Sequence, residues 1–203
     1  MTAPRPRRAT ETPAALDDRA RENLSFIRAT MERAASFTGV PGWGGVAMGL
    51  TALVAALVAH GRSTPRAWLT VWLVEGLVAF LIGAWALGRK ARRDHGRVLT
   101  RSGRQFVLSF APPILVGAVL TVALVAAQQW NLLPGVWLLL YGTGIVTGGA
   151  FSVRVVPLMG FTMMLIGLIA LFAPARWGDA CMAVGFGAVQ LGFGLVIAGR
   201  HGG

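Results

Sequence analysis

Long runs without a charged side chain dominate this sequence, and they restrict what the chain can fold into. No Asp, Glu, Lys or Arg occurs between residues 105 and 153, and similar runs cover residues 34–61 and 180–199. A helix of about 20 apolar residues crosses the roughly 30 Å hydrocarbon core of a bilayer. Only 13% of the 203 residues are charged, whereas about a quarter are charged in a typical soluble domain. The sequence therefore predicts an all-α, polytopic transmembrane helical bundle.

We predict six spans, with five as the alternative. The count depends on the short join between the fourth and fifth spans, which together are about twice as long as one crossing requires. Pro157 provides a break at this join, because proline interrupts a helix. The predicted spans cover residues 42–60, 67–88, 105–127, 135–152, 156–172 and 178–199. Most connections are short, so successive helices are expected to be antiparallel neighbours.

The chain is expected to divide into an N-terminal tail, residues 1–40, and a six-span transmembrane domain, residues 41–203. Apolar residues recur in the tail at steps of three and four, which predicts an amphipathic helix lying in the cytoplasmic interface. A helix that docks on a partner or on a second protomer is the alternative, because the stripe resembles two heptads of a coiled-coil seam. The stripe consists of Ala20, Leu24, Ile27, Met31 and Ala34.

The distribution of basic residues predicts the orientation. With the N-terminus in the cytoplasm, 16 of the 19 Lys and Arg residues lie on the cytoplasmic side, and Arg62, Arg66 and Arg176 lie outside. Such a bias is typical of bacterial membrane proteins, and it explains the net charge of +11 without a nucleic-acid partner. The preference for Arg, Ala, Gly and Val is typical of a GC-rich bacterial genome. We therefore expect a multi-pass protein of the bacterial inner membrane, with both termini cytoplasmic.

Two GxxxG pairs are candidates for helix packing. Gly45 and Gly49 lie in the first span, and Gly144 and Gly148 lie in the fourth. Small residues let helices approach closely in lipid, where no hydrophobic effect drives helices together. We expect these glycines to pack inside the molecule; a homo-oligomer or a partner membrane protein is the alternative use.

Glu75 is the one carboxylate deep within a predicted span, and it is the principal candidate for chemistry. It shares a helix face with Trp72 and Ala79, so it is expected to point into the bundle. A charged group at this depth costs about 3 kcal/mol to insert, so it needs a partner. Tyr141, at a similar depth in the fourth span, is the expected donor. The pair is either a packed hydrogen bond with a protonated Glu75 or a site that binds a proton or a cation.

No cofactor, metal or catalytic motif is predicted. Cys181 is the single cysteine, which excludes an internal disulfide and a multi-Cys metal site. Nothing matches a P-loop, a Rossmann fingerprint, HExxH or GxSxG. The sequence thus favours a non-enzymatic membrane protein with a structural or regulatory role, or a subunit of a larger complex. A small proton- or cation-linked transporter or channel that uses Glu75 is the alternative.

Two segments resemble a family of bacterial polytopic integral membrane proteins to which no function is attached. They are residues 30–45, with Phe37-Thr38-Gly39-Val40-Pro41-Gly42-Trp43, and residues 140–154, with Leu140-Tyr141-Gly142-Thr143-Gly144. The resemblance implies a membrane-embedded helical fold, and it assigns no activity and no site residues.

Overall fold

The computed structural model describes Arg21, residues 23–25, 42–93, 101–150 and 152–201. The chain separates into two units, residues 1–36 and residues 37–203. In the first unit Arg21 and residues 23–25 are helical. The rest of the predicted amphipathic helix lies outside the described residues.

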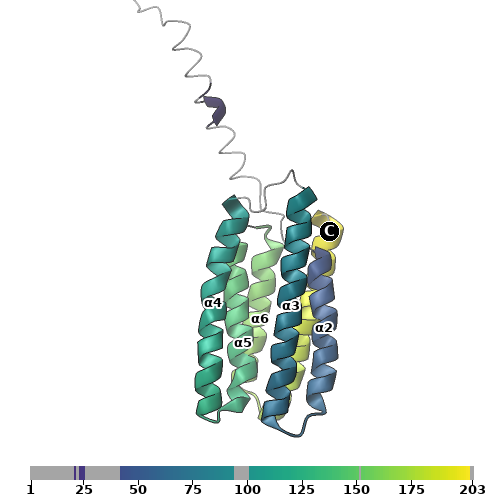
Figure 1. Ribbon diagram of the computed structural model, residues 1–203, viewed down its shortest axis with the longest axis vertical. Helices are drawn as coiled ribbons and strands as arrows, with labels where there is room; N and C mark the ends of the chain where they lie inside the picture. Colours follow the sequence, from purple (N-terminus) through teal and green to yellow (C-terminus); the bar gives the residue numbers. More distant parts are fainter. Residues whose placement is uncertain (1–20, 22, 26–41, 94–100, 151, 202–203) are drawn as a thin grey trace, which may run out of the picture. The chain divides into compact units, whose positions relative to one another are not determined.

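Within its described residues the second unit contains six long helices and no strand, which confirms the all-α bundle and the count of six spans (Figure 1). The first five are α2 (Gly42–His60), α3 (Pro65–Arg93), α4 (Arg101–Ala126), α5 (Leu133–Gly149) and α6 (Val155–Phe172). The sixth is built from α7 (Gly178–Met182), the π-helix η3 (Ala183–Val189) and α8 (Gln190–His201). Single 3-10 turns, η1 (Trp130–Leu132) and η2 (Ala175–Trp177), precede α5 and α7. All six spans are long and apolar enough to cross a membrane.

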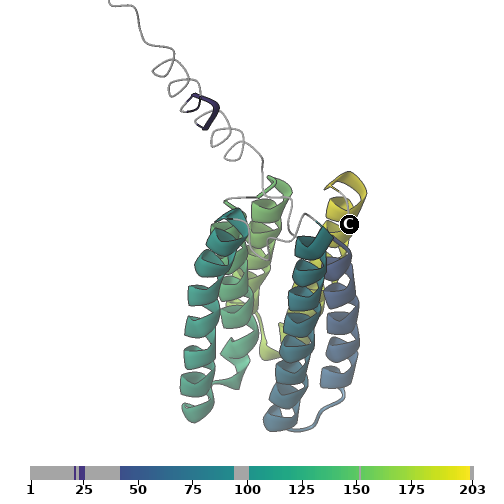
Figure 2. The same cartoon turned by 45° about the horizontal axis from the view of Figure 1, so that its top comes forward.

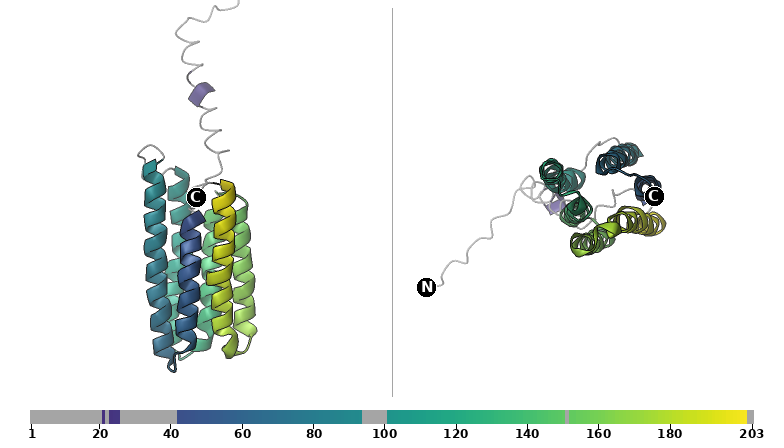
Figure 3. Two further views of the ribbon diagram at one scale, coloured as in Figure 1. Left: turned by 90° about the vertical axis from the view of Figure 1, so that its right-hand side faces the viewer. Right: turned by 90° about the horizontal axis from the view of Figure 1, so that it is seen from below.

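The helices run alternately up and down and form a ring that is open at one seam. α2 packs against α3, α4 against α5, and α5 against α6, while α8 and η3 of the sixth span pack back against α2. In the described part of the chain α3 and α4 are not among the closely packed helix pairs. The views along and across the bundle show these two helices at the ends of the series (Figures 2 and 3).

Small residues line the helix contacts, and large apolar residues face outward. The buried face of α2 consists only of Gly and Ala, from Gly42 to Ala59. Large side chains such as Leu57, Val122 and Phe172 are exposed instead. This pattern is the one expected in lipid, where tight packing rather than hydrophobic burial holds helices together. The bundle is accordingly a multi-pass membrane protein.

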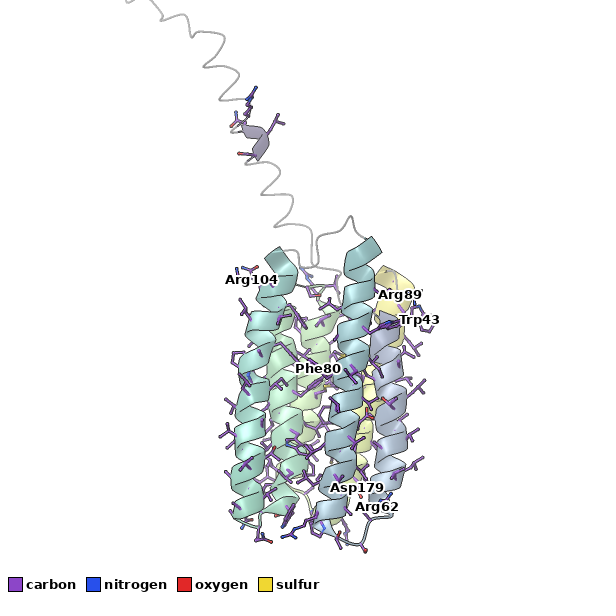
Figure 4. All side chains as sticks on the ribbon, in the orientation of Figure 1. Trp43, Arg62, Phe80, Arg89, Arg104 and Asp179 are labelled. Carbon is purple, nitrogen blue, oxygen red and sulfur yellow. The ribbon has the colours of Figure 1, made fainter. Side chains whose placement is uncertain are left out.

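The alternation of the spans sorts the charged residues between the two ends of the bundle. Arg62 and Asp179 lie at one end, and Arg89 and Arg104 lie at the other (Figure 4). α3 and α4 extend to Arg93 and back to Arg101, several residues beyond the predicted spans. These extensions contain basic residues. The predicted spans ended before them because the spans were defined by length and apolarity.

Candidate functional site

Glu75 lies inside the bundle, on the side of α3 that meets α2. Its residue surface is 9% exposed. The Thr51 hydroxyl donates a hydrogen bond to Glu75 Oε1 at 2.8 Å. Thr51 stands midway along α2, and α2 packs against α3. The carboxyl group is therefore held between the first two spans.

Tyr141 is not the donor to Glu75, so that part of the expected pair was wrong. Its hydroxyl accepts a hydrogen bond from Gln190 Nε2 at 3.3 Å. The reason is the order of the helices: α5 packs on α4 and α6, whereas α3 packs on α2. Equal depth in the membrane was not sufficient to bring the two side chains together.

The Thr51 hydroxyl has one hydrogen and three acceptors within reach. Besides Glu75 Oε1, its oxygen lies 3.2 Å from the Ala47 carbonyl oxygen and 3.0 Å from that of Met48. If Glu75 is ionised, the hydroxyl donates to the carboxylate. If Glu75 is protonated, the carboxylic acid can donate to Thr51 Oγ1, and the hydroxyl can turn to a backbone carbonyl. The pair can thus accommodate either protonation state without moving a helix.

Seven aromatic rings form a continuous column through the interior. Adjacent centroids are 5.1–6.3 Å apart, the spacing of stacked and edge-to-face pairs. In order the rings are Trp137, Trp68, Trp72, Phe186, Tyr141, Phe110 and Phe106. This column was not predicted from the sequence. Its signals were the four-residue spacings of Trp68 with Trp72 and of Phe106 with Phe110, which place each pair on one helix face.

The π-helix η3 interrupts the α-helical pattern of the sixth span. Long π-helices are rare, and they occur frequently at functional sites. This one places Phe186 in the aromatic column and ends beside Gln190. Two buried polar atoms near it, Trp72 Nε1 and Gln190 Oε1, have no hydrogen-bond partner among the described residues. The polar interior at this depth therefore comprises Glu75 with Thr51 and, separately, Tyr141 with Gln190.

A second polar cluster links the helices at the end that carries Arg62. Asp179, at the start of α7, accepts a hydrogen bond from Trp68 Nε1 and lies 3.4 Å from His60 Nδ1. Nearby, Trp137 Nε1 donates to Thr121 Oγ1 at 2.8 Å. Because Trp68 stacks on Trp137, these contacts connect α2, α3, α4, α5 and α7. The cluster closes this end of the aromatic column.

The four predicted packing glycines all lie at contacts inside the chain. A Cβ at Gly45 would be 3.3 Å from Gly194 Cα, and one at Gly49 would be 2.6 Å from the Leu191 nitrogen. Gly144 faces Phe110 and Gly148 faces Phe106, with ring atoms 2.9 and 3.0 Å from the added Cβ. The first pair thus joins α2 to α8, and the second joins α5 to α4.

In the described residues no group of three His, Cys, Asp or Glu side chains is placed to hold a metal ion. The Glu75 carboxyl group can exchange a proton, and the other polar groups at the site form hydrogen bonds from helix to helix. Comparison with protein-family models, curated proteins and solved structures finds no match to this chain.

Proposed function

We propose that this chain is a non-enzymatic protein of the bacterial inner membrane that acts as a structural or regulatory element or as a subunit of a larger complex. One observation carries the proposal: three hydrogen bonds between polar side chains of the spans join one helix to another. Thr51 binds Glu75 between α2 and α3, Gln190 binds Tyr141 between α8 and α5, and Trp137 binds Thr121 between α5 and α4. In this proposal Glu75 is protonated, and its hydrogen bond to Thr51 holds α2 and α3 together.

The filled interior supports the same conclusion. The aromatic column occupies the space between α3, η3, α5 and α4, where a transporter of this size would need a polar path. Polar and ionisable groups in a membrane are expensive and often functional. Here Glu75, Tyr141 and Thr121 each take part in a hydrogen bond that joins two helices.

Proton-linked transport through Glu75 is the second candidate, and one observation favours it. The Thr51 hydroxyl can donate either to the Glu75 carboxylate or to a carbonyl of its own helix. This arrangement would let the carboxyl group gain and lose a proton at low structural cost. A path from Glu75 to both membrane surfaces would also be required.

Proton flux separates the two candidates. The purified protein would be reconstituted into vesicles that contain a pH-sensitive dye, and a pH gradient would be imposed across the membrane. We expect the rate of dye response for wild type and for Glu75→Gln to equal the rate in protein-free vesicles. Flux in wild type that disappears in Glu75→Gln would replace the proposal with the transport function. Flux that is equal in both proteins would also reject it, and would place the path elsewhere.

A further inference from the structure

An aromatic and basic corner marks the end of the bundle where α2 begins and α3 ends. Trp43 and Trp85 are 62% and 64% exposed, although indole side chains are large and apolar. The Arg89 guanidinium carbon lies 5.2 Å from the Trp85 ring centroid, which is within the range of a cation–π contact. The corner thus presents two indoles and one stacked guanidinium to the surroundings.

The packing register of α2 and α3 places Trp43 and Arg89 at nearly one level, and Trp85 lies roughly 6 Å, about one helical turn, closer to the middle of the bundle. A Cβ at Gly83 would lie 3.7 Å from Met48 Sδ, so residues 48 and 83 face each other across the helix pair. The helices are antiparallel, and a helix rises about 1.5 Å per residue. From that contact Trp43 lies about 7.5 Å and Arg89 about 9 Å toward the same end of the bundle. Figure 4 shows both residues at this end.

Trp43 lies at the start of the first candidate span and Arg89 at the end of the second, so this level is where the hydrocarbon core is expected to meet the lipid headgroups. Tryptophan is enriched there because its ring is apolar and its N–H is polar. Beneath the corner, Leu50 of α2 and Leu81 of α3 are exposed on the membrane-facing surface. The Arg89 guanidinium can contact the headgroup of a phospholipid, and the exposed leucines below it can contact the acyl chains.

We propose that Trp43, Trp85 and Arg89 form a binding site for an anionic phospholipid. Arg89 binds the phosphate through paired N–H donors, a geometry for which arginine is well suited. The Trp85 ring holds the guanidinium in place, and the two indoles flank the headgroup. The acyl chains lie against Leu50 and Leu81. Net negative charge on the lipid is preferred because, among the described residues, no carboxylate is paired with Arg89.

Arg104 provides the matched comparison. It lies at the same end of the bundle, at the start of α4, and its side chain is also exposed. Among the described residues Arg89 is the cation that stacks on an aromatic ring, and Arg104 is not. A diffuse attraction to basic residues would treat the two arginines alike, whereas the proposed site depends on Arg89.

The test is lipid binding to the full-length protein in detergent, followed by native mass spectrometry. Phosphatidylglycerol and phosphatidylcholine would be titrated separately. An interfacial Lys or Arg contributes about 1 kcal/mol to anionic-lipid binding, so Arg89→Gln is expected to weaken phosphatidylglycerol binding about fivefold. Trp85→Phe should weaken it about two- to threefold, because Phe is a poorer cation–π partner. Arg104→Gln and binding of phosphatidylcholine to wild type serve as the controls.

Three results would overturn the proposal. Arg104→Gln could weaken phosphatidylglycerol binding as much as Arg89→Gln, or phosphatidylcholine could bind as tightly as phosphatidylglycerol. Excess inorganic phosphate could displace the lipid, which would identify a site for free phosphate instead. Arg89→Lys guards against a folding defect, because it keeps the charge and loses the paired donors. It should bind more weakly than wild type and more tightly than Arg89→Gln; binding equal to wild type would reject the role of the guanidinium.

Discussion

Among the individual side chains, Glu75 shows how a carboxyl group is accommodated in the middle of a membrane protein. A buried polar group is costly unless it is hydrogen-bonded, and the Thr51 hydroxyl of α2 supplies a hydrogen bond to Glu75 of α3. Tyr141 is supported differently, by Gln190 and by edge-to-face contacts with Phe110 and Phe186. Both polar groups therefore contribute to the way neighbouring helices are joined.

Removal of the Thr51 hydroxyl should destabilise the bundle. Thr51→Val keeps the shape of the side chain and leaves Glu75 without its donor, which costs about 1–3 kcal/mol for a buried polar group. Thr51→Ser keeps the hydroxyl and should retain most of the stability. The free energy of unfolding, measured by denaturant titration in mild detergent, checks both expectations.

Thr162 offers a control for that measurement. Its hydroxyl bonds to the Leu158 carbonyl of its own helix and is exposed. Thr162→Val should change the unfolding free energy by less than about 0.5 kcal/mol, as is usual for exposed sites. If Thr51→Val is equally mild, the hydrogen bond to Glu75 does not stabilise the fold.

Between helices, glycine determines how closely two backbones approach. At the contact of α5 with α6, a Cβ on Gly160 would lie 2.7 Å from the Gly142 carbonyl oxygen and 2.9 Å from the Val146 nitrogen. Backbone atoms cannot move aside as the end of a side chain can. Gly192 in α8 has open space at its Cβ position. Both glycines lie in helices, so the different space around their Cβ positions comes from the packing of neighbouring helices.

Substitution by alanine should distinguish these two glycines sharply. Gly160→Ala overpacks the α5–α6 contact and should lower the free energy of unfolding by about 1–3 kcal/mol, the range for overpacked cores. Gly192→Ala meets no neighbour and should be neutral or stabilising by up to about 1 kcal/mol, because Ala has the higher helix propensity. Thermal unfolding of the two variants in the same detergent tests the contrast. Equal melting temperatures would contradict the packing of α5 against α6.

For the bundle as a whole, the order of the helices around the ring follows their order in the chain, and the ring closes between the sixth span and α2. In the described part of the chain, α3 and α4 are the consecutive spans that are not closely packed against each other, and their joining segment includes residues 94–100. Short connections hold consecutive helices side by side, and the other consecutive spans are closely packed.

The proposed orientation predicts which connections between helices face the periplasm. A reporter inserted after Ser63, between α2 and α3, or after Gln128, between α4 and η1, should report the periplasmic side. A reporter fused after Gly203 should report the cytoplasm. The reason is that 16 of 19 basic residues fall on the side assigned to the cytoplasm. A cytoplasmic signal from the Gln128 insertion would show that the predicted topology is wrong.

Length and apolarity were enough to predict six spans, because a helix that crosses a hydrocarbon core needs about 20 consecutive apolar residues, whatever its neighbours are. Helical periodicity was enough to place Glu75 on the same face as Trp72, and both are buried. Neither property could show that Thr51 would be the donor to Glu75, nor that Trp68, Phe186 and Tyr141 would belong to one aromatic column. Those contacts depend on which helices are neighbours, how each is rotated about its axis, and the π-helical segment that shifts the register of the sixth span. Lipid accepts many such arrangements of the same six spans, and only close packing at the helix contacts selects one of them.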